Sequence, residues 1–254
     1  MARTKIAAVS YLNTIPFIYG IEHSGVLSAE LLLSPPSGCA RAFIDGKADV
    51  ALVPAAAVPA IPDAEIVTDY CIGATGPVRT VVMMCDCPLR EIRRVHLDFH
   101  SLTSARLIKI LADKLWKIAP EWVELTDYAK TDNPQPGDAF LLIGDKVFAA
   151  EGKFRYTFDL AEAWQKLTRM PFAFAVWIAR KGVSREVTDA LQHALTYGVE
   201  HTWEAIVEHG FDDRDYAYEY LTRNIDFVFD AQKYKALQKF WDTGLRVSLR
   251  ANPG

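Results

Sequence analysis

The feature that most constrains this fold is the alternation of short apolar runs with helix-length segments over the first 54 residues. Three of these runs predict strands, at residues 6–9, 30–33 and 48–53. The segments between them predict a short helix or turn at residues 18–27 and a helix at residues 38–44, the latter capped by Ser37. A β-α-β-α-β order implies parallel strands joined by crossover connections. The chain therefore opens with an α/β sheet.

The first strand delivers polar side chains to its carboxyl end. Ser10 and Asn13 follow the apolar run directly, and Pro16 keeps a regular helix from beginning before it. Open α/β sheets bind ligands at the carboxyl ends of their strands, and an uncharged amide both donates and accepts hydrogen bonds. A polar turn in which Ser10 and Asn13 satisfy backbone groups explains the pattern equally well. Spacing alone leaves both interpretations open.

A second series of elements follows the turn at residues 75–80. A strand at residues 95–97 leads to hydroxyl residues at the start of a helix predicted over residues 105–116. The residues in question are Ser101, Thr103 and Ser104. Such a helix start has the form of an anion site, because free amides and the helix dipole point at the ligand. An N-cap accounts for one hydroxyl without any ligand.

Another strongly apolar run, at residues 139–143, ends in Gly144 and Asp145. A glycine at this point lets a ligand or a second backbone approach closely. Asp145 is a candidate catalytic group, although an Asp after a strand more often organises hydrogen bonds. Residues 121–126 and 171–179 predict further strands, residues 156–167 predict a helix, and the C-terminal third is largely helical.

A length of 254 residues favours two lobes over a single hydrophobic core. The chain is expected to cross between lobes near residues 78–85 and 170–176. These crossings give a discontinuous first lobe, residues 1–82 plus 174–254, and a second lobe, residues 83–173. A small anionic ligand is expected in the cleft between the two lobes, where hinge closure can enclose it.

Charge and composition exclude several classes of partner. The net charge of −4 argues against nucleic acid or an anionic membrane surface. No run reaches membrane-spanning length and the N-terminus lacks a secretory signal, so a cytoplasmic location is expected. The four cysteines lack paired CxxC spacing and the six histidines are scattered, so we expect reduced thiols, no metal site and no cofactor. The oligomeric state is left open.

Six segments together resemble one family, the chorismate dehydratases of the futalosine route to menaquinone. They are VSYLNTIPF at 9–17, GKADVALVP at 46–54, TGPVRTV at 75–81, LDFHSLTSARL at 97–107, LLIGD at 141–145 and DLAEAWQKLTRMPFAFAVWIAR at 159–180. Their order and spacing hold over nearly the whole chain. The resemblance implies an α/β fold of the two-lobed periplasmic-binding-protein type II, with a ligand cleft between lobes and no export. It also implies removal of water from chorismate, giving 3-(1-carboxyvinyloxy)benzoate.

The same resemblance implies roles for residues in the matched segments. Asn13 and Thr80 are the expected catalytic residues; the family usually has Ser where this chain has Thr80, and the hydroxyl is retained. The expected substrate-binding residues are Ser10, Ser101, Thr103, Ser104, Gly144 and Asp145.

Two positions depart from the family pattern. Leu102 stands where the pattern has Arg, so Arg79, Arg106 or the helix dipole has to bind the substrate carboxylate instead. After Pro54, many members carry Ser and an acidic residue, whereas this chain has three alanines at 55–57. These departures bear on substrate specificity more than on the fold.

The general base stays open among Asp145, His100 and the substrate's own enolpyruvyl carboxylate. Two other functions also stay open. One is a non-catalytic binding protein for a small anion with the same fold. The other is an enzyme like 1,4-dihydroxy-6-naphthoate synthase, for which the opening loop is expected to read Pro-Asn-Asp instead of Tyr-Leu-Asn-Thr.

Overall fold

The computed structural model describes residues 3–98 and 101–251, and the chain divides into two α/β units. Unit 1 comprises Met1–Ala74 and Ala173–Ala231, and unit 2 comprises Thr75–Phe172 and Gln232–Gly254. The chain passes from one unit to the other between residues 74 and 75 and again between residues 172 and 173. The largest difference from the expected lobes is the C-terminal segment, which belongs to unit 2.

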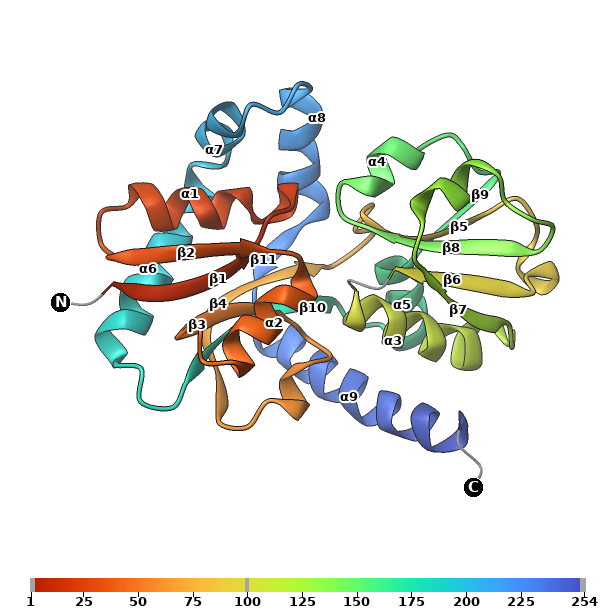
Figure 1. Ribbon diagram of the computed structural model, residues 1–254, viewed down its shortest axis with the longest axis horizontal. Coiled ribbons are helices and arrows are strands. Elements are labelled where there is room, and N and C mark those ends of the chain that lie inside the picture. Colours follow the sequence, from red (N-terminus) through yellow and green to blue (C-terminus); the bar gives the residue numbers. More distant parts are fainter. Residues whose placement is uncertain (1–2, 99–100, 252–254) are drawn as a thin grey trace. The chain divides into compact units, whose positions relative to one another are not determined.

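In the described part of the chain, unit 1 contains a six-stranded sheet of order β11-β4-β10-β3-β1-β2 (Figure 1). Its strands are β1 (Thr4–Val9), β2 (Ala29–Ser34), β3 (Val50–Pro54), β4 (Ala64–Ala74), β10 (Phe172–Arg180) and β11 (Asp226–Val228). As predicted, β1 pairs in parallel with both β2 and β3. The apolar strand β10 returns the chain to this sheet, antiparallel to β3.

The helices of unit 1 are α1 (Ile15–His23), α2 (Pro36–Ile44), α6 (Arg185–Glu200), α7 (Thr202–His209) and α8 (Arg214–Glu219). Shorter helical turns are η1 (Leu12–Thr14), η2 (Val58–Ala60) and η6 (Tyr220–Asn224). α1 begins earlier than predicted because Pro16 lies in its first turn, where its missing N–H is not needed. The predicted cap Ser37 is wrong: α2 begins at Pro36, so Ser37 lies inside the helix.

α1 and α6 pack backbone against backbone at two glycines. A Cβ built on Gly20 would lie 2.0 Å from the carbonyl oxygen of Ala194. A Cβ on Gly198 would lie 1.8 Å from the carbonyl oxygen of Pro16. No side chain fits at either position, so this contact fixes α1 closely against α6.

Unit 2 contains, among the described residues, a five-stranded sheet of order β7-β6-β8-β5-β9. Its strands are β5 (Val81–Cys85), β6 (Arg94–Asp98), β7 (Glu121–Leu125), β8 (Asp138–Ile143) and β9 (Tyr156–Asp159). β6 is parallel to both β7 and β8, whereas β5 is antiparallel to β8 and β9. The carboxyl ends of β6 and β8 and the amino end of β5 therefore share one edge of this sheet.

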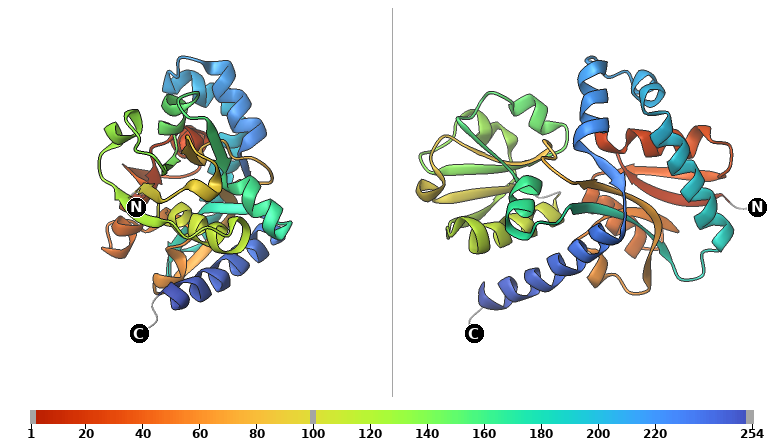
Figure 2. Two further views of the ribbon diagram at one scale, coloured as in Figure 1. Left: turned by 90° about the vertical axis from the view of Figure 1, so that its right-hand side faces the viewer. Right: turned by 180° about the vertical axis from the view of Figure 1, so that it is seen from behind.

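The helices of unit 2 are α3 (Leu102–Leu111), α4 (Lys146–Ala150), α5 (Leu160–Thr168) and α9 (Ala231–Ala251), with shorter turns η3 (Leu89–Glu91), η4 (Ala112–Trp116) and η5 (Tyr128–Asp132). One face of the sheet buries Val82, Met84, Phe140 and Leu142 against α4. The long final helix α9 (Figure 2) joins this unit because Phe240 packs edge-on against Trp164 and Phe172, with ring centres 6.3 and 5.1 Å away. No helix in the described ranges is long and apolar enough to cross a bilayer.

Candidate functional site

Asn13 lies on a short anchored turn after β1. Its neighbours Leu12 and Thr14 are buried, whereas Asn13 itself is half-buried. The hydroxyl of Thr14 donates a hydrogen bond to Oδ1 of Asn13 at 3.1 Å. With the amide oxygen held in this way, the NH₂ group is the end that can donate to a ligand. The turn thus places an uncharged donor at the carboxyl edge of the unit 1 sheet.

Ser10 has a different environment from Asn13. It is exposed and lines a hollow of about 310 Å³ together with Tyr19 and Glu22 of α1 and Glu208 of α7. Asn13 is not among the described residues that line this hollow. The structure therefore does not bring Ser10 and Asn13 together in it.

Three predicted site segments meet at one edge of the unit 2 sheet. Thr80 precedes β5, Ser101 follows β6 and Gly144 follows β8. Val81 lies opposite Ile143 in the antiparallel pair, so Thr80 and Gly144, which flank them, are neighbours. The amide of Gly144 donates a hydrogen bond to the carbonyl of Thr80 at 2.9 Å. Gly144 has a φ of +62°, a conformation that glycine adopts without strain. Strand pairing thus joins two residues that the sequence singled out separately.

The residue before Thr80 is held in a strained conformation. Arg79 has a φ of +64°, which is unfavourable for a side chain with a Cβ. Its amide donates to Oδ2 of Asp159 at 2.8 Å, while Oδ1 of Asp159 caps α5 by accepting from Ala161 and Glu162 at 2.9 and 3.0 Å. Burial, opposed by these hydrogen bonds, raises the pKa of Asp159. Sequence reasoning missed Asp159, although an Asp directly before a helix is a recognisable cap.

α3 begins at Leu102, three residues before the predicted start of the helix. Ser101 is the N-cap, and its Oγ accepts from the amide of Ser104 at 3.4 Å. Ser101, Thr103 and Ser104 are all buried at the amino end of α3, which is the positive end of the helix dipole. Leu102 is 47% exposed. His100 lies outside the described residues.

Next to Asp145, the structure reveals a charged group that the sequence did not predict. Nζ of Lys146 donates to Oδ2 of Asp98 at 2.8 Å and to the hydroxyl of Tyr128. It also lies 4.1 Å from the centre of the Tyr128 ring, in a cation–π contact. The Asp98 side chain is fully buried, whereas that of Lys146 is 30% exposed. A partly exposed ammonium thus lies at the edge where the predicted binding loops meet.

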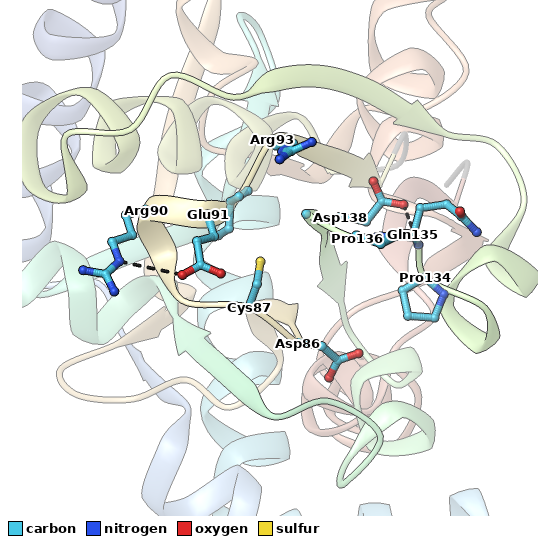
Figure 3. Close-up of a pocket in the computed structure, with 11 residues that line it drawn as sticks. Asp86, Cys87, Arg90, Glu91, Arg93, Pro134, Gln135, Pro136 and Asp138 are labelled. Carbon is cyan, nitrogen blue, oxygen red and sulfur yellow. Dashed lines mark hydrogen bonds and ion pairs between the residues drawn. The ribbon is translucent and has the colours of Figure 1, made fainter.

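A larger hollow, of about 630 Å³, opens at the opposite edge of the unit 2 sheet (Figure 3). It contains none of the predicted site residues and is lined in part by Cys87, Arg90, Arg93 and Asp138. Arg94 pairs in register with Asp138, so this is the edge where β6 and β8 begin. Burial of Asp138 opposes its ionisation, but hydrogen bonds from Arg94 and the Gln135 amide, together with the nearby His96 ring, hold its pKa below the usual range.

The sequence model of one family, described as menaquinone biosynthesis, matches residues 4–245. The chain belongs to this family. The match includes every predicted site residue, from Ser10 to Asp145.

Solved structures similar to this menaquinone-biosynthesis chain establish its fold. A protein from Archaeoglobus fulgidus has a TM-score of 0.76 at 17% identity, covering 97% of this chain and 98% of its own. A Candida albicans gene product described as having the generic periplasmic-binding-protein fold has a TM-score of 0.62 at 15% identity, covering 100% and 92%. The periplasmic aliphatic sulphonate binding protein SsuA from Escherichia coli has a TM-score of 0.68 at 15% identity, covering 100% and 94%.

The menaquinone-biosynthesis chain therefore has the periplasmic-binding-protein-like α/β fold that its motifs implied. At these identities the similarity concerns the fold alone. The expected ligand cleft stays a prediction.

Proposed function

We propose that this member of the menaquinone biosynthesis family is a chorismate dehydratase, a hydro-lyase that converts chorismate to 3-(1-carboxyvinyloxy)benzoate. Two observations together support the proposal. The chain matches the family model, and uncharged hydrogen-bond donors lie at the carboxyl edge of each sheet, on the Asn13 turn and at the start of α3. Elimination from a dicarboxylate needs anion binding and a donor for the departing hydroxide. The described loops offer residues for both tasks.

In the proposed reaction, the ring carbon that bears the enolpyruvyl ether loses a proton and the neighbouring carbon loses hydroxide. The two leaving groups together form one water, and the ring becomes aromatic. Aromatisation supplies the thermodynamic drive, so the protein has to fix geometry and steer the leaving groups. It also has to favour this elimination over other breakdown routes of chorismate.

Asn13 is the proposed catalytic donor. With its oxygen engaged by Thr14, its NH₂ group can orient the departing hydroxyl or stabilise charge that develops on the ring carboxylate. A preorganised donor of this kind is worth roughly 2–4 kcal/mol in the transition state. The hydroxyl of Thr80 is the proposed second catalytic group, held at the sheet edge through the bond from Gly144.

The start of α3 is the proposed binding site for a substrate carboxylate. Three hydroxyl residues, Ser101, Thr103 and Ser104, and the first-turn amides suit an anion there without a positively charged side chain. This arrangement accounts for the tolerance of Leu102 where the family pattern has Arg. Gly144, Asp145 and Ser10 are proposed as further substrate contacts, and Asp145 or the substrate's own carboxylate as the proton acceptor.

Incubation of the purified chain with chorismate tests the proposal. We expect a product lighter by one water, with benzoate absorbance, at a rate above that of the protein-free control. Asn13→Ala should abolish this product, whereas Asn133→Ala, at an exposed loop position, should not. Chorismate that binds but stays intact would overturn the proposal.

A non-catalytic binding protein for a small anion is the second candidate, favoured by the structural similarity to the sulphonate-binding protein. Calorimetric binding of chorismate without turnover would support it. Turnover of a cyclic futalosine derivative with no turnover of chorismate would support instead an enzyme like 1,4-dihydroxy-6-naphthoate synthase.

A further inference from the structure

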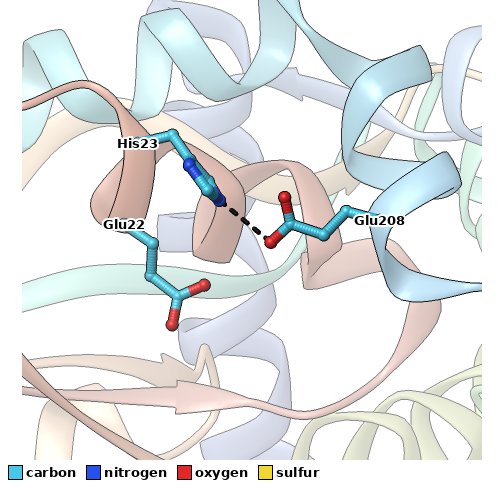
Figure 4. A group of neighbouring side chains, drawn as sticks. All are labelled: Glu22, His23 and Glu208. Atoms are coloured by element: carbon cyan, nitrogen blue, oxygen red, sulfur yellow. Dashed lines mark hydrogen bonds and ion pairs between the residues drawn. The ribbon is translucent and has the colours of Figure 1, made fainter.

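Three potential metal ligands gather on unit 1, outside the proposed catalytic residues (Figure 4). One donor atom from each of Glu22, His23 and Glu208 lies within 4.8 Å of the others. Nε2 of His23 is 2.9 Å from Oε1 of Glu208, to which it points across the gap between two helices. The group therefore combines one imidazole nitrogen with two carboxylates.

The backbone beneath these donors is anchored. Glu22 and His23 lie in the last turn of α1, and Glu208 lies in the last turn of α7, which packs against α1. The backbone contact between Gly20 and α6 fixes the same end of α1. Only side-chain torsions then have to change to bring the donors into one coordination sphere.

The imidazole of His23 is also oriented. Its ring packs on that of Tyr19 with centres 4.3 Å apart, and Tyr19 in turn stacks on Tyr197 at 6.2 Å. Glu204 lies one turn before Glu208 on α7, so a further carboxylate adds negative charge nearby.

We propose that Glu22, His23 and Glu208 form a binding site for a divalent transition-metal ion such as Zn²⁺. Imidazole and carboxylate ligands suit Zn²⁺ at about 2.0–2.2 Å, whereas Mg²⁺ and Ca²⁺ prefer oxygen ligands alone. Tetrahedral ligands at such bond lengths are about 3.4 Å apart, so a modest closure of exposed side chains suffices. The fourth position would hold water or an external ligand.

The hollow of about 310 Å³ that Ser10 lines adjoins this group, since Glu22 and Glu208 also line it. His209 is a further nitrogen donor on the wall of the hollow. A metal ion at the three donors would thus have room beside it for a small coordinating anion. Sequence analysis predicted no metal site, because His23 and Glu208 are 185 positions apart.

Isothermal titration of the full, tag-free chain with Zn²⁺ tests the proposal. We expect one ion per chain, and Co²⁺ should give the visible absorption of a four-coordinate complex. His23→Gln should weaken Zn²⁺ binding at least tenfold, and Glu208→Gln should do the same. The side chains of His23 and Glu208 are 40% and 53% exposed, so both variants should keep the circular dichroism and melting temperature of the parent.

Two matched controls address other sites on the chain. His193→Gln removes another exposed histidine, on α6, and Cys87→Ser removes the half-buried thiol; neither should change Zn²⁺ affinity. Zn²⁺ binding that is unchanged in His23→Gln, or that is lost in either control, would overturn the proposal. Displacement of Zn²⁺ by equimolar Mg²⁺ would overturn its assignment to a transition metal.

Discussion

The ammonium of Lys146 lies 2.8 Å from Oδ2 of Asp98, so an ion pair joins the start of α4 to the end of β6. Lys146→Met should lower the free energy of unfolding by roughly 3–5 kcal/mol, because a fully buried carboxylate then loses its ammonium partner. Urea denaturation measures the change. The double variant Asp98→Asn/Lys146→Met should recover part of the loss, and strictly additive effects would contradict a direct coupling.

The hydroxyl of Thr80 can be separated from its methyl group by two substitutions. Thr80→Ser keeps the hydroxyl and should retain chorismate turnover within a few-fold. Thr80→Val keeps the shape and should lower kcat about 100-fold, the scale of losing one preorganised donor. Steady-state kinetics with circular dichroism as a folding check distinguish the two. Equal activity in both variants would remove Thr80 from the mechanism.

Asp138 should make the stability depend on pH. Since hydrogen bonds hold its folded pKa below the usual range, its contribution is present above the unfolded pKa of about 3.9 and is lost as the pH falls through the folded value. Asp138→Asn should therefore cost about 2 kcal/mol at pH 7 and progressively less below pH 4. Urea denaturation midpoints of the parent and the variant, measured at pH 7 and at pH 3, check this difference.

The stability contribution of Asp159 should change with pH in the opposite direction to that of Asp138. Burial raises its pKa, so ionisation costs stability as the pH rises from the unfolded pKa towards the folded one. The cost of Asp159→Asn should accordingly be smaller at pH 7 than at pH 3. The same pH trend in the Asp138 and Asp159 variants would contradict these assignments.

The glycine contact between α1 and α6 should tolerate no added methyl group. Gly198→Ala would place a Cβ 1.8 Å from the carbonyl oxygen of Pro16, and one helix would have to move. We expect a loss of more than about 2 kcal/mol, within the upper range for overpacking. Gly76→Ala is the matched control, because a Cβ there meets nothing within 4 Å. Thermal melting that shows equal effects would argue against the close helix contact.

Strands β1, β3, β5, β8 and β10 could be predicted because each is a short, buried apolar run. Strand β9 is not such a run, and the sequence predicted a helix there. Ser101 could be predicted as a cap because a hydroxyl preceded an amphipathic helix. The pairing of Lys146 with Asp98 could not, since only the parallel contact of β6 with β8 joins positions 48 residues apart. Arg79 gave no local sign of its positive φ, because glycine usually occupies that conformation.

The placement of α9 likewise lay outside local sequence information. An apolar residue such as Phe240 indicates a buried helix face but not the element against which that face packs. The partners of Phe240, Trp164 and Phe172, are more than sixty residues earlier in the chain. Periodicity predicted the helix but not the unit that it covers. Sequence analysis assigned α9 to the first lobe because it continues the chain of that lobe. In the structure α9 belongs to unit 2 because of its aromatic contacts.

That placement has a consequence for biosynthesis. During synthesis the chain emerges from the ribosome from its N-terminus onwards. The core around Trp164 therefore lacks one of its aromatic partners until Phe240 has emerged. The sheet of unit 1 is likewise incomplete until β10 and β11 have been synthesised. Both strands come after residues 75–171, which belong to unit 2. Neither half can therefore finish folding until β11 and Phe240, respectively, have been synthesised, long after the first boundary between the units has passed.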